Sequence, residues 1–280
     1  MKVIVIGGSG YIGSNVARKI SADKVAYYSR SNNDELDKAG VEWIKGDILD
    51  KDKVMSAIKD YDMIVDAAGI DSETDQKYFD VNVNGIKNIV EAVKKYDTDQ
   101  RLVYLSSINV HYGSTEFFRT KRTGEDNAAL VKNHLNVRPS VVFGNEDKFT
   151  GKVFKLASGN FSKLPAGGAI CPVHVEDLVK VIEGAKDLRG AVDICSRDKI
   201  SFAETINLAL EKMGKKPKKI VAGKFGYKGA LQSVKNAGVF DSEEIDKLLL
   251  NFYRENTYLD RFVKEPQSFR EYIKNYSHQE

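Results

Sequence analysis

The chain has 280 residues, 42% of them hydrophobic, a length that suits one large domain or one domain with an added lobe. Its 43 basic and 40 acidic residues give a net charge of +3. This near balance argues against nucleic acid as the main partner, because nucleic-acid-binding proteins usually carry a one-sided basic field. No apolar stretch is long enough to span a bilayer, so we expect no membrane partner either.

The N-terminus opens directly on a predicted strand rather than on a secretion signal, so we expect a cytoplasmic protein. Cys171 and Cys195 lack metal-type spacing and sit in apolar surroundings, so we interpret them as small buried side chains and expect no metal site. A reducing compartment fits this interpretation. The basic cluster at 215–219 (KKPKK) is interpreted as a solvated loop rather than a binding site.

The first thirteen residues, MKVIVIGGSGYIG, run from an apolar strand into three spaced glycines, Gly7, Gly10 and Gly13. A strand that ends in such glycines and opens a helix forms a pocket for a diphosphate, because the turn is tight and the helix N-terminus offers free N–H donors. We therefore predict a dinucleotide site that also includes Tyr11 and Ile12. The alternative is a plain strand–turn–helix.

Short β-type runs alternate with helical segments, which is typical of a parallel sheet with helices on both faces. Strands are expected at Lys2–Ile6, Val25–Ser29, Glu42–Lys45, Met63–Ala67, Arg101–Ser106, Asn136–Phe143 and Ala191–Cys195. Helices are expected at Tyr11–Ser21, Lys51–Ile58, Phe79–Lys95, Thr115–Asn133, Val175–Ala185, Phe202–Lys212, Ser242–Arg254 and Ser268–Tyr276, with a capping box formed by Ser201 and Glu204.

The predicted fold class is α/β: a doubly wound parallel sheet (Rossmann) with a smaller C-terminal substrate lobe. We assign residues 1–145 to the dinucleotide-binding domain, completed by about 173–198. Residues 146–280 form mainly the substrate lobe and a C-terminal tail.

The end of the second strand bears on the choice of cofactor. A carboxylate at this place binds the ribose 2′-hydroxyl of NAD, whereas a basic residue accommodates the 2′-phosphate of NADP. The chain offers Ser29 and Arg30 and no acid until Asp34, which favours NADP, with NAD as the alternative. After the third strand, Asp47 is expected to accept a hydrogen bond from the adenine amino group while Ile48 covers the ring.

Together these segments resemble the short-chain dehydrogenase/reductase superfamily, in its extended or atypical branch of epimerase/dehydratase-like proteins. The resemblance covers most of residues 1–210 and rests on the order and spacing of the glycine motif, GDILD (46–50), DAAG (66–69), VNVNGIKN (81–88), LSS (105–107), RPSVVFG (138–144) and PVHVED (172–177). It implies that Ala67, Ala68 and Gly69 line the cofactor beyond its diphosphate. In the family, two helices pair across a dimer, so a homodimer is open for this chain.

The active centre departs from the family pattern, which uses a serine or threonine after the fifth strand and a Tyr-x-x-x-Lys motif on the next helix. Ser107 matches the serine and Lys121 the lysine, which also holds the nicotinamide ribose, but Phe117 stands where the tyrosine should be. Phenylalanine has no proton to give, and loss of a general acid costs about 10²–10⁴-fold in rate. Tyr112 is a candidate substitute, and its neighbour His111 is a second one; packing of the loop is the alternative for both.

The sequence thus predicts an NAD(P)-binding protein similar to nucleoside-sugar epimerases and reductases. One hypothesis is an oxidoreductase with a non-standard active site that acts on an unknown small-molecule substrate. The other is a non-catalytic nucleotide-binding sensor or scaffold subunit, because the stretch around Phe117 also resembles atypical members such as the accessory subunit of respiratory complex I.

Overall fold

The computed structural model describes residues 1–70, 72–73, 75–96, 99–255 and 257–277, with the backbone alone at 224–225. The chain divides into two compact units. Unit 1 comprises residues 1–139, 175–194 and 261–263, and unit 2 comprises 140–174, 195–260 and 264–280. Within the described residues, no helix is long and apolar enough to cross a membrane.

Unit 1 contains a seven-stranded sheet in the order β11-β6-β5-β4-β1-β2-β3. Every neighbouring pair of strands in it is parallel. The strands are β1 (Lys2–Ile6), β2 (Lys24–Ser29), β3 (Glu42–Lys45), β4 (Met63–Asp66), β5 (Arg101–Leu105), β6 (His134–Pro139) and β11 (Gly190–Ile194). The order reverses at β1, whose neighbours are β2 and β4, and a crevice for a ligand forms at such a reversal.

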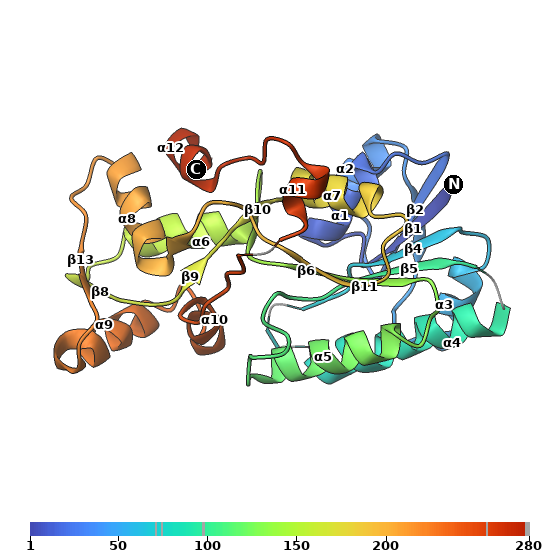
Figure 1. The fold of residues 1–280 in the computed structure, drawn as a ribbon, viewed down its shortest axis with the longest axis horizontal. Coiled ribbons are helices and arrows are strands. Elements are labelled where there is room, and N and C mark those ends of the chain that lie inside the picture. The colour runs from blue at the N-terminus through green and yellow to red at the C-terminus, as the bar shows by residue number, and fades with distance from the viewer. Residues whose placement is uncertain (71, 74, 97–98, 256, 278–280) are drawn as a thin grey trace. The chain divides into compact units, whose positions relative to one another are not determined.

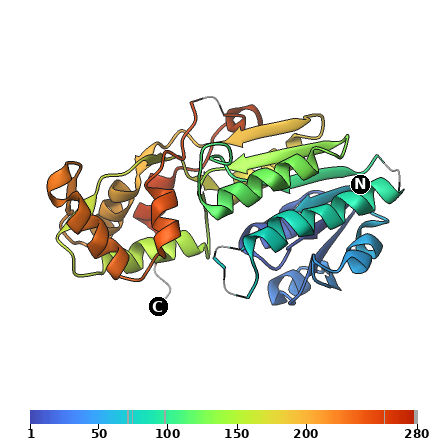
Figure 2. The same cartoon turned by 90° about the horizontal axis from the view of Figure 1, so that it is seen from below.

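Helices cover both faces of this sheet, as the predicted doubly wound fold requires (Figure 1). One face carries α1 (Tyr11–Lys19), α2 (Asp34–Lys38) and α7 (Val175–Gly184), and the other carries α3 (Lys51–Ile58), α4 (Ile86–Tyr96) and α5 (Glu116–Ala128). Figure 2 shows α4 and α5 side by side. Strands buried on both faces read as continuous apolar runs, which explains why the sequence of β1 shows no alternation.

The core on the α3–α5 face is built from alternate residues of the strands, because side chains of a strand point to opposite faces in turn. Ile4 and Ile6 of β1, Tyr28 of β2 and Ile64 of β4 lie in this cluster with Leu102 of β5. The helices contribute the apolar face that the periodicity predicted, including Ile86, Ile89, Val90 and Val93 of α4.

Unit 2 is assembled from short strands and helices. Its elements are β7 (Val142–Phe143), α6 (Lys148–Ala157), β8 (Lys163–Pro165), β9 (Ala169–Ile170), β10 (Val173–His174), β12 (Ile200–Ser201), α8 (Phe202–Lys212), β13 (Lys219–Val221), α9 (Lys224–Asn236), α10 (Ser242–Leu248) and α12 (Phe269–Asn275). A short helix, α11 (Leu259–Phe262), contains residues of both units. The strands pair as β7 with β10, β9 with β12 and β8 with β13.

Several predicted boundaries need correction. The strand expected at Asn136–Phe143 is two strands, because Pro139 ends β6 and the chain enters unit 2 at Ser140. The helix expected from Phe79 opens as a π-helix at Asp80–Gly85, and the helix expected to reach Asn133 ends at Ala128. The capping box of α8 is confirmed, since the Ser201 and Glu204 side chains each bind the other's backbone N–H.

The two cysteines also differ from expectation. Both are buried, as predicted, but Cys171 and Cys195 form a disulfide within unit 2, with 5.3 Å between their Cα atoms. Two cysteines without metal-type spacing carry no sign of whether they pair, so the sequence does not predict this bond.

Candidate functional site

The glycine turn after β1 brings that strand against the end of β4. Gly7 has a positive φ of 76°, and a Cβ built on it would lie 2.6 Å from the Cα of Ala68. A Cβ on Gly13 would lie 2.3 Å from the carbonyl oxygen of Gly7. Any side chain at these two positions would therefore collide with backbone. The packing of the turn on itself and on Ala68 thus requires both glycines.

Gly10 has a different environment from the other two glycines of the turn, Gly7 and Gly13. It is exposed at the N-cap of α1, and a Cβ built there would lie 3.3 Å from the Gly7 carbonyl oxygen, a looser contact than at Gly7 or Gly13. No side chain caps the helix at this residue. The first N–H groups of α1 therefore lack intrahelical acceptors and face a side of the turn without a side chain, which fits a diphosphate.

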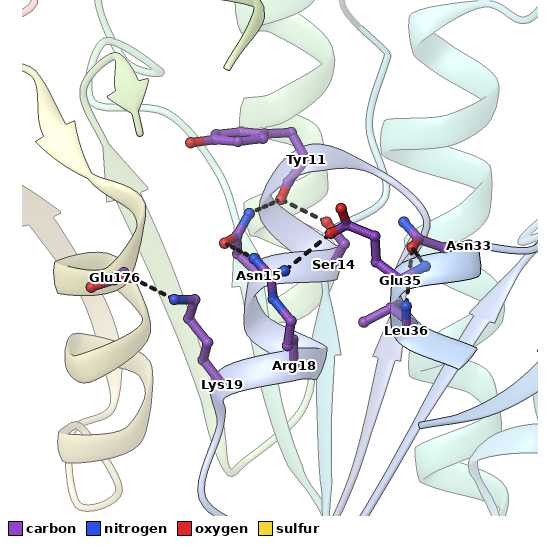
Figure 3. A network of polar contacts seen from close by, with 9 residues as sticks. All are labelled: Tyr11, Ser14, Asn15, Arg18, Lys19, Asn33, Glu35, Leu36 and Glu176. Carbon is purple, nitrogen blue, oxygen red and sulfur yellow. Dashed lines mark hydrogen bonds and ion pairs between the residues drawn. The ribbon is translucent and has the colours of Figure 1, made fainter. Parts of the chain in front are cut away.

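Helix α1 is held in place by polar contacts beyond its first turn (Figure 3). The Tyr11 carbonyl accepts hydrogen bonds from Asn15 Nδ2 at 2.9 Å and Ser14 Oγ at 3.1 Å, while the Tyr11 ring points away from them. Arg18 forms an ion pair of 3.0 Å with Glu35 of α2. Lys19 pairs with Glu176 of α7. The last turn of the helix is thus fixed from two neighbouring helices.

The predicted adenosine end lies after β2 and β3. Ser29 is buried and donates to the Ser31 carbonyl at 2.6 Å, which shapes the loop that carries Arg30. Arg30 is exposed and has no ion pair or hydrogen bond with another described residue. Asp47 accepts from the backbone N–H of Leu49 at 3.0 Å, and Ile48 is buried against Gly85.

A buried lysine lies behind the ends of β4 and β5. Lys121 of α5 donates to the Leu105 carbonyl at 2.8 Å, and its Nζ lies 4.9 Å from the centre of the Tyr104 ring. A Cβ on Gly69 would lie 3.8 Å from the same Nζ. Burial lowers the pKa of Lys121 to about 8, against the charges of Asp66 and Glu125, which raise it.

Two further polar groups accompany this lysine. Asp66, at the end of β4, is buried and accepts from the Ala68 N–H at 3.1 Å. Burial raises the pKa of Asp66 to about 6, although Lys121 acts in the opposite direction. Ser106 Oγ is buried without a hydrogen-bond partner among the described residues, which leaves a polar atom for a ligand or water.

Three comparisons with known proteins bear on this arrangement. The model of the NAD dependent epimerase/dehydratase family matches residues 3–132. This stretch is less than half of the chain, and over it the chain is similar to this family. The match includes the glycine turn, Asp66 and Lys121, so the predicted resemblance to short-chain dehydrogenases/reductases of the epimerase type is confirmed.

Individual relatives fall into two groups. The 40 kDa subunit of NADH-ubiquinone oxidoreductase from Neurospora crassa is 31% identical over 193 residues, which are 64% of this chain and 50% of that protein. CDP-paratose 2-epimerase of Salmonella typhi is 29% identical over 140 residues, 44% of this chain and 41% of that protein. These curated relatives are thus matched over half of their length or less.

A solved structure of UDP-glucose 4-epimerase from Thermus thermophilus in complex with NAD has a TM-score of 0.72 at 20% identity. It covers 98% of this chain and 97% of that one. At this level of identity the similarity shows the fold alone, which is the predicted Rossmann fold.

The family's catalytic positions are placed as follows. Phe117 is half-buried on α5, and its ring makes edge contacts with Tyr78 and Phe118 at centroid distances of 5.6 and 5.3 Å. Ser107 is buried just after β5, two residues beyond the carbonyl that binds Lys121. Tyr112 is 79% exposed, so its side chain is not enclosed with Ser107 and Lys121.

Sequence reasoning missed a charged network on the loop that carries Ser107. Glu125, one helical turn after Lys121, accepts from Arg138 Nε at 2.7 Å, and Arg138 also donates to His111 Nε2 at 2.7 Å. The three residues come from α5, β6 and the loop after β5, and no sequence spacing links them, so the sequence carries no signal for this network.

The glycine turn leads to a pair of opposite expectations. We expect Gly7→Ala to lower the free energy of unfolding by about 2 kcal/mol or more, because of its positive φ and the collision with Ala68. Gly10→Ala should stay within about 1 kcal/mol of the unchanged chain, since Gly10 has an extended backbone, but should weaken NADH binding. Urea unfolding and a fluorescence titration measure the two effects. If Gly7→Ala and Gly10→Ala lowered the free energy of unfolding equally, the distinction between a structural Gly7 and a ligand-facing Gly10 would be wrong.

The buried lysine predicts a pH dependence of stability. Between about pH 8 and the ordinary pKa of lysine, Lys121 has lost its proton in the folded chain and keeps it in the unfolded one. Folding stability therefore rises with pH in this window. The difference in unfolding free energy between the unchanged chain and Lys121→Met isolates this contribution, because other titrating groups are shared. We expect the unchanged chain to gain stability relative to Lys121→Met from pH 8 to pH 10. A difference in unfolding free energy that does not change with pH would contradict the lowered pKa of Lys121.

Proposed function

We propose that the chain binds a nicotinamide dinucleotide and holds it without the tyrosine-mediated proton transfer of the family's enzymes. The observation that carries the proposal is the combination of Lys121 and Phe117 on one face of α5. The ammonium is buried at the ends of β4 and β5, where a ribose would lie. The ring four residues earlier makes edge contacts with Tyr78 and Phe118 and has no hydroxyl.

The residues of unit 1 fit such a cofactor along its length. Gly10 leaves room for a diphosphate at the N-terminus of α1, where Gly7 and Gly13 set the turn. Ala67, Ala68 and Gly69 follow β4 beside Lys121, with Ser106 Oγ as a buried polar atom in need of a partner. When bound, the nicotinamide supplies the hydride donor or acceptor of the family's chemistry. The chain's own contribution is to bind and orient it.

NADP is the form that we propose. Arg30 is exposed at the end of β2 and is not engaged by another described side chain, so its planar guanidinium is available for a 2′-phosphate. Two of the nearby acids are engaged elsewhere: Glu35 pairs with Arg18, and Asp37 contacts Asn32 and Tyr27. NAD is the alternative, because several solved structures of similar fold contain NAD.

A second candidate is an oxidoreductase or epimerase with a substitute proton donor. Its support is the burial of Ser107 close in sequence to the carbonyl that binds Lys121, which preserves two of the three catalytic positions. The substrate class would be a nucleotide sugar, since relatives and solved structures of similar fold include CDP-paratose 2-epimerase and UDP-glucose 4-epimerase. Tyr112 would then have to reach the site from its exposed position.

A titration with NADPH and NADH, followed by nucleotide fluorescence, tests the cofactor proposal. We expect NADPH to bind more tightly, and Arg30→Ala to weaken NADPH binding about tenfold while leaving NADH unchanged, because charge-assisted hydrogen bonds to the phosphate are lost. Lys38→Ala is the matched control, since Lys38 is another exposed cation near the same loop. Tighter binding of NADH than of NADPH would contradict the proposed role of Arg30. Binding of neither nucleotide would contradict the proposed function.

Turnover separates the two candidate functions. With bound NADPH or NAD and a panel of nucleotide sugars, we expect no change of the cofactor's redox state in the unchanged chain. Phe117→Tyr restores the phenol four residues before Lys121 and should raise any turnover by about 10²-fold or more. Turnover by the unchanged chain that falls on Ser107→Ala and Tyr112→Phe would instead establish the second candidate.

A further inference from the structure

One stretch of unit 2 has a charge composition unlike the rest of the chain. Residues 212–240 contain eight lysines and neither aspartate nor glutamate. Because the whole chain has a net charge of only +3, the remaining residues together are net negative. The positive charge is therefore concentrated in one segment, which the balanced overall composition conceals.

The structure orders this segment rather than leaving it as a loose loop. Asn207 of α8 binds the backbone of Lys218 twice, donating to its carbonyl at 3.0 Å and accepting from its N–H at 2.8 Å. The next residues form β13, which pairs in parallel with β8 and places Lys219 beside Lys163. Helix α9 packs on β8, and Figure 1 shows β13 and α9 next to β8.

Most lysines of this region are exposed and have no acidic partner among the described residues. Five of them, which we call the lysine surface, are exposed and form no ion pair with another described residue: Lys163, Lys215, Lys216, Lys219 and Lys228. Lys235, farther along α9, does have a partner, Asp246, at 2.9 Å. Partial burial, followed by the charge of Lys215, lowers the pKa of Lys218, which shows that the cations are close together.

The apolar residues of the region distinguish between two kinds of polyanion. Single-stranded nucleic acid needs free aromatic faces for stacking, but the Phe161 ring is covered by the Lys218 ammonium at 3.5 Å from its centre. The exposed large apolar side chain among the described residues of the stretch is aliphatic: Ile220, 39% exposed, next to Lys219. An aliphatic side chain amid lysines suits the boundary between lipid headgroups and acyl chains.

We propose that the lysine surface of unit 2 binds the face of an anionic lipid bilayer. Lysines near such a surface are attracted by its negative potential, at about fivefold in affinity for each lysine, and the attraction falls off within a Debye length. Ile220 adds a small apolar contact. Such association with the bilayer surface needs no membrane-spanning helix. The proposal therefore departs from the expectation of no membrane partner, which rested on the overall charge and on the lack of a spanning segment.

The test is co-sedimentation of the full chain with vesicles of phosphatidylcholine alone or mixed with phosphatidylserine. We expect binding to the mixed vesicles only, weaker at physiological than at low ionic strength. The triple substitution Lys215→Ala, Lys216→Ala and Lys219→Ala should lower the partition coefficient about a hundredfold. Lys218 is left unchanged, because its ammonium binds the Gly159 carbonyl at 2.8 Å within unit 2.

The matched control removes three exposed lysines of unit 1, Lys59, Lys94 and Lys132, none of which has an ion pair with another described residue. We expect this triple variant to bind mixed vesicles almost as the unchanged chain does. An equal loss in both triple variants would overturn the proposal, since it would show that total charge alone decides. Absence of binding to the mixed vesicles would overturn it as well.

Two measurements keep the result interpretable. Thermal unfolding of the Lys215, Lys216 and Lys219 variant should match that of the unchanged chain, and Ile220→Ser, which removes no charge, should reduce vesicle binding severalfold on its own. The same variants are titrated with a single-stranded oligonucleotide. Tighter binding to the oligonucleotide than to mixed vesicles, lost in the triple variant, would assign the surface to nucleic acid and overturn the proposal.

Discussion

The close approach of the β1 and β4 ends is the constraint on which the rest of unit 1 depends. Gly7 can lie against Ala68 only because it has no Cβ and adopts a positive φ. Gly13 in turn packs on the Gly7 carbonyl, which fixes where α1 begins relative to β1. The free N–H groups of α1 are therefore aimed at the point where the strand order reverses. The candidate site therefore depends on backbone packing before any polar side chain contributes.

The buried ammonium of Lys121 is the second organising feature, and it opposes folding. Its charge is disfavoured by burial more than it is supported by Asp66 and Glu125, as the direction of its pKa shift shows. Asp66 shows the same imbalance with the opposite charge, since burial raises its pKa as well. A group that destabilises the folded chain points to a function, because perturbed titratable groups cluster at binding and catalytic sites.

Much of unit 1 was predictable because short-range patterns determine it. The apolar runs and their spacing predicted the strands and the parallel sheet, and in unit 2 Ser201 with Glu204 predicted the start of α8. What sequence could not supply were contacts between distant segments, such as the disulfide of Cys171 and Cys195 or the network of Glu125, Arg138 and His111. The division of Asn136–Phe143 into β6 and β7 likewise depends on pairing partners far along the chain, β11 and β10.

The segment 215–219 shows what an average leaves out. Net charge and a lone basic cluster both favour a solvated loop, and the proposal of a lipid-binding surface rests instead on the length of chain without an acid, which runs to Phe240. Pairing of β13 with β8 then adds Lys163 to the same surface from a distance of more than fifty residues. A cation on a loop loses side-chain freedom when it binds, whereas one on an ordered strand has its backbone already in place.

The contrast between Lys121 and Phe117 bears most directly on what the chain does. In the family pattern the lysine serves twice, holding the ribose and lowering the pKa of the tyrosine. In this chain the lysine has no tyrosine whose pKa it could lower. The ring of Phe117 has no hydroxyl and packs by its edge against Tyr78 and Phe118. The penalty for burying the ammonium remains the same with or without a phenol beside it. Without the phenol, what the buried ammonium would contribute is ligand binding, and this contrast is the basis of the proposal that the chain holds a dinucleotide rather than consuming it.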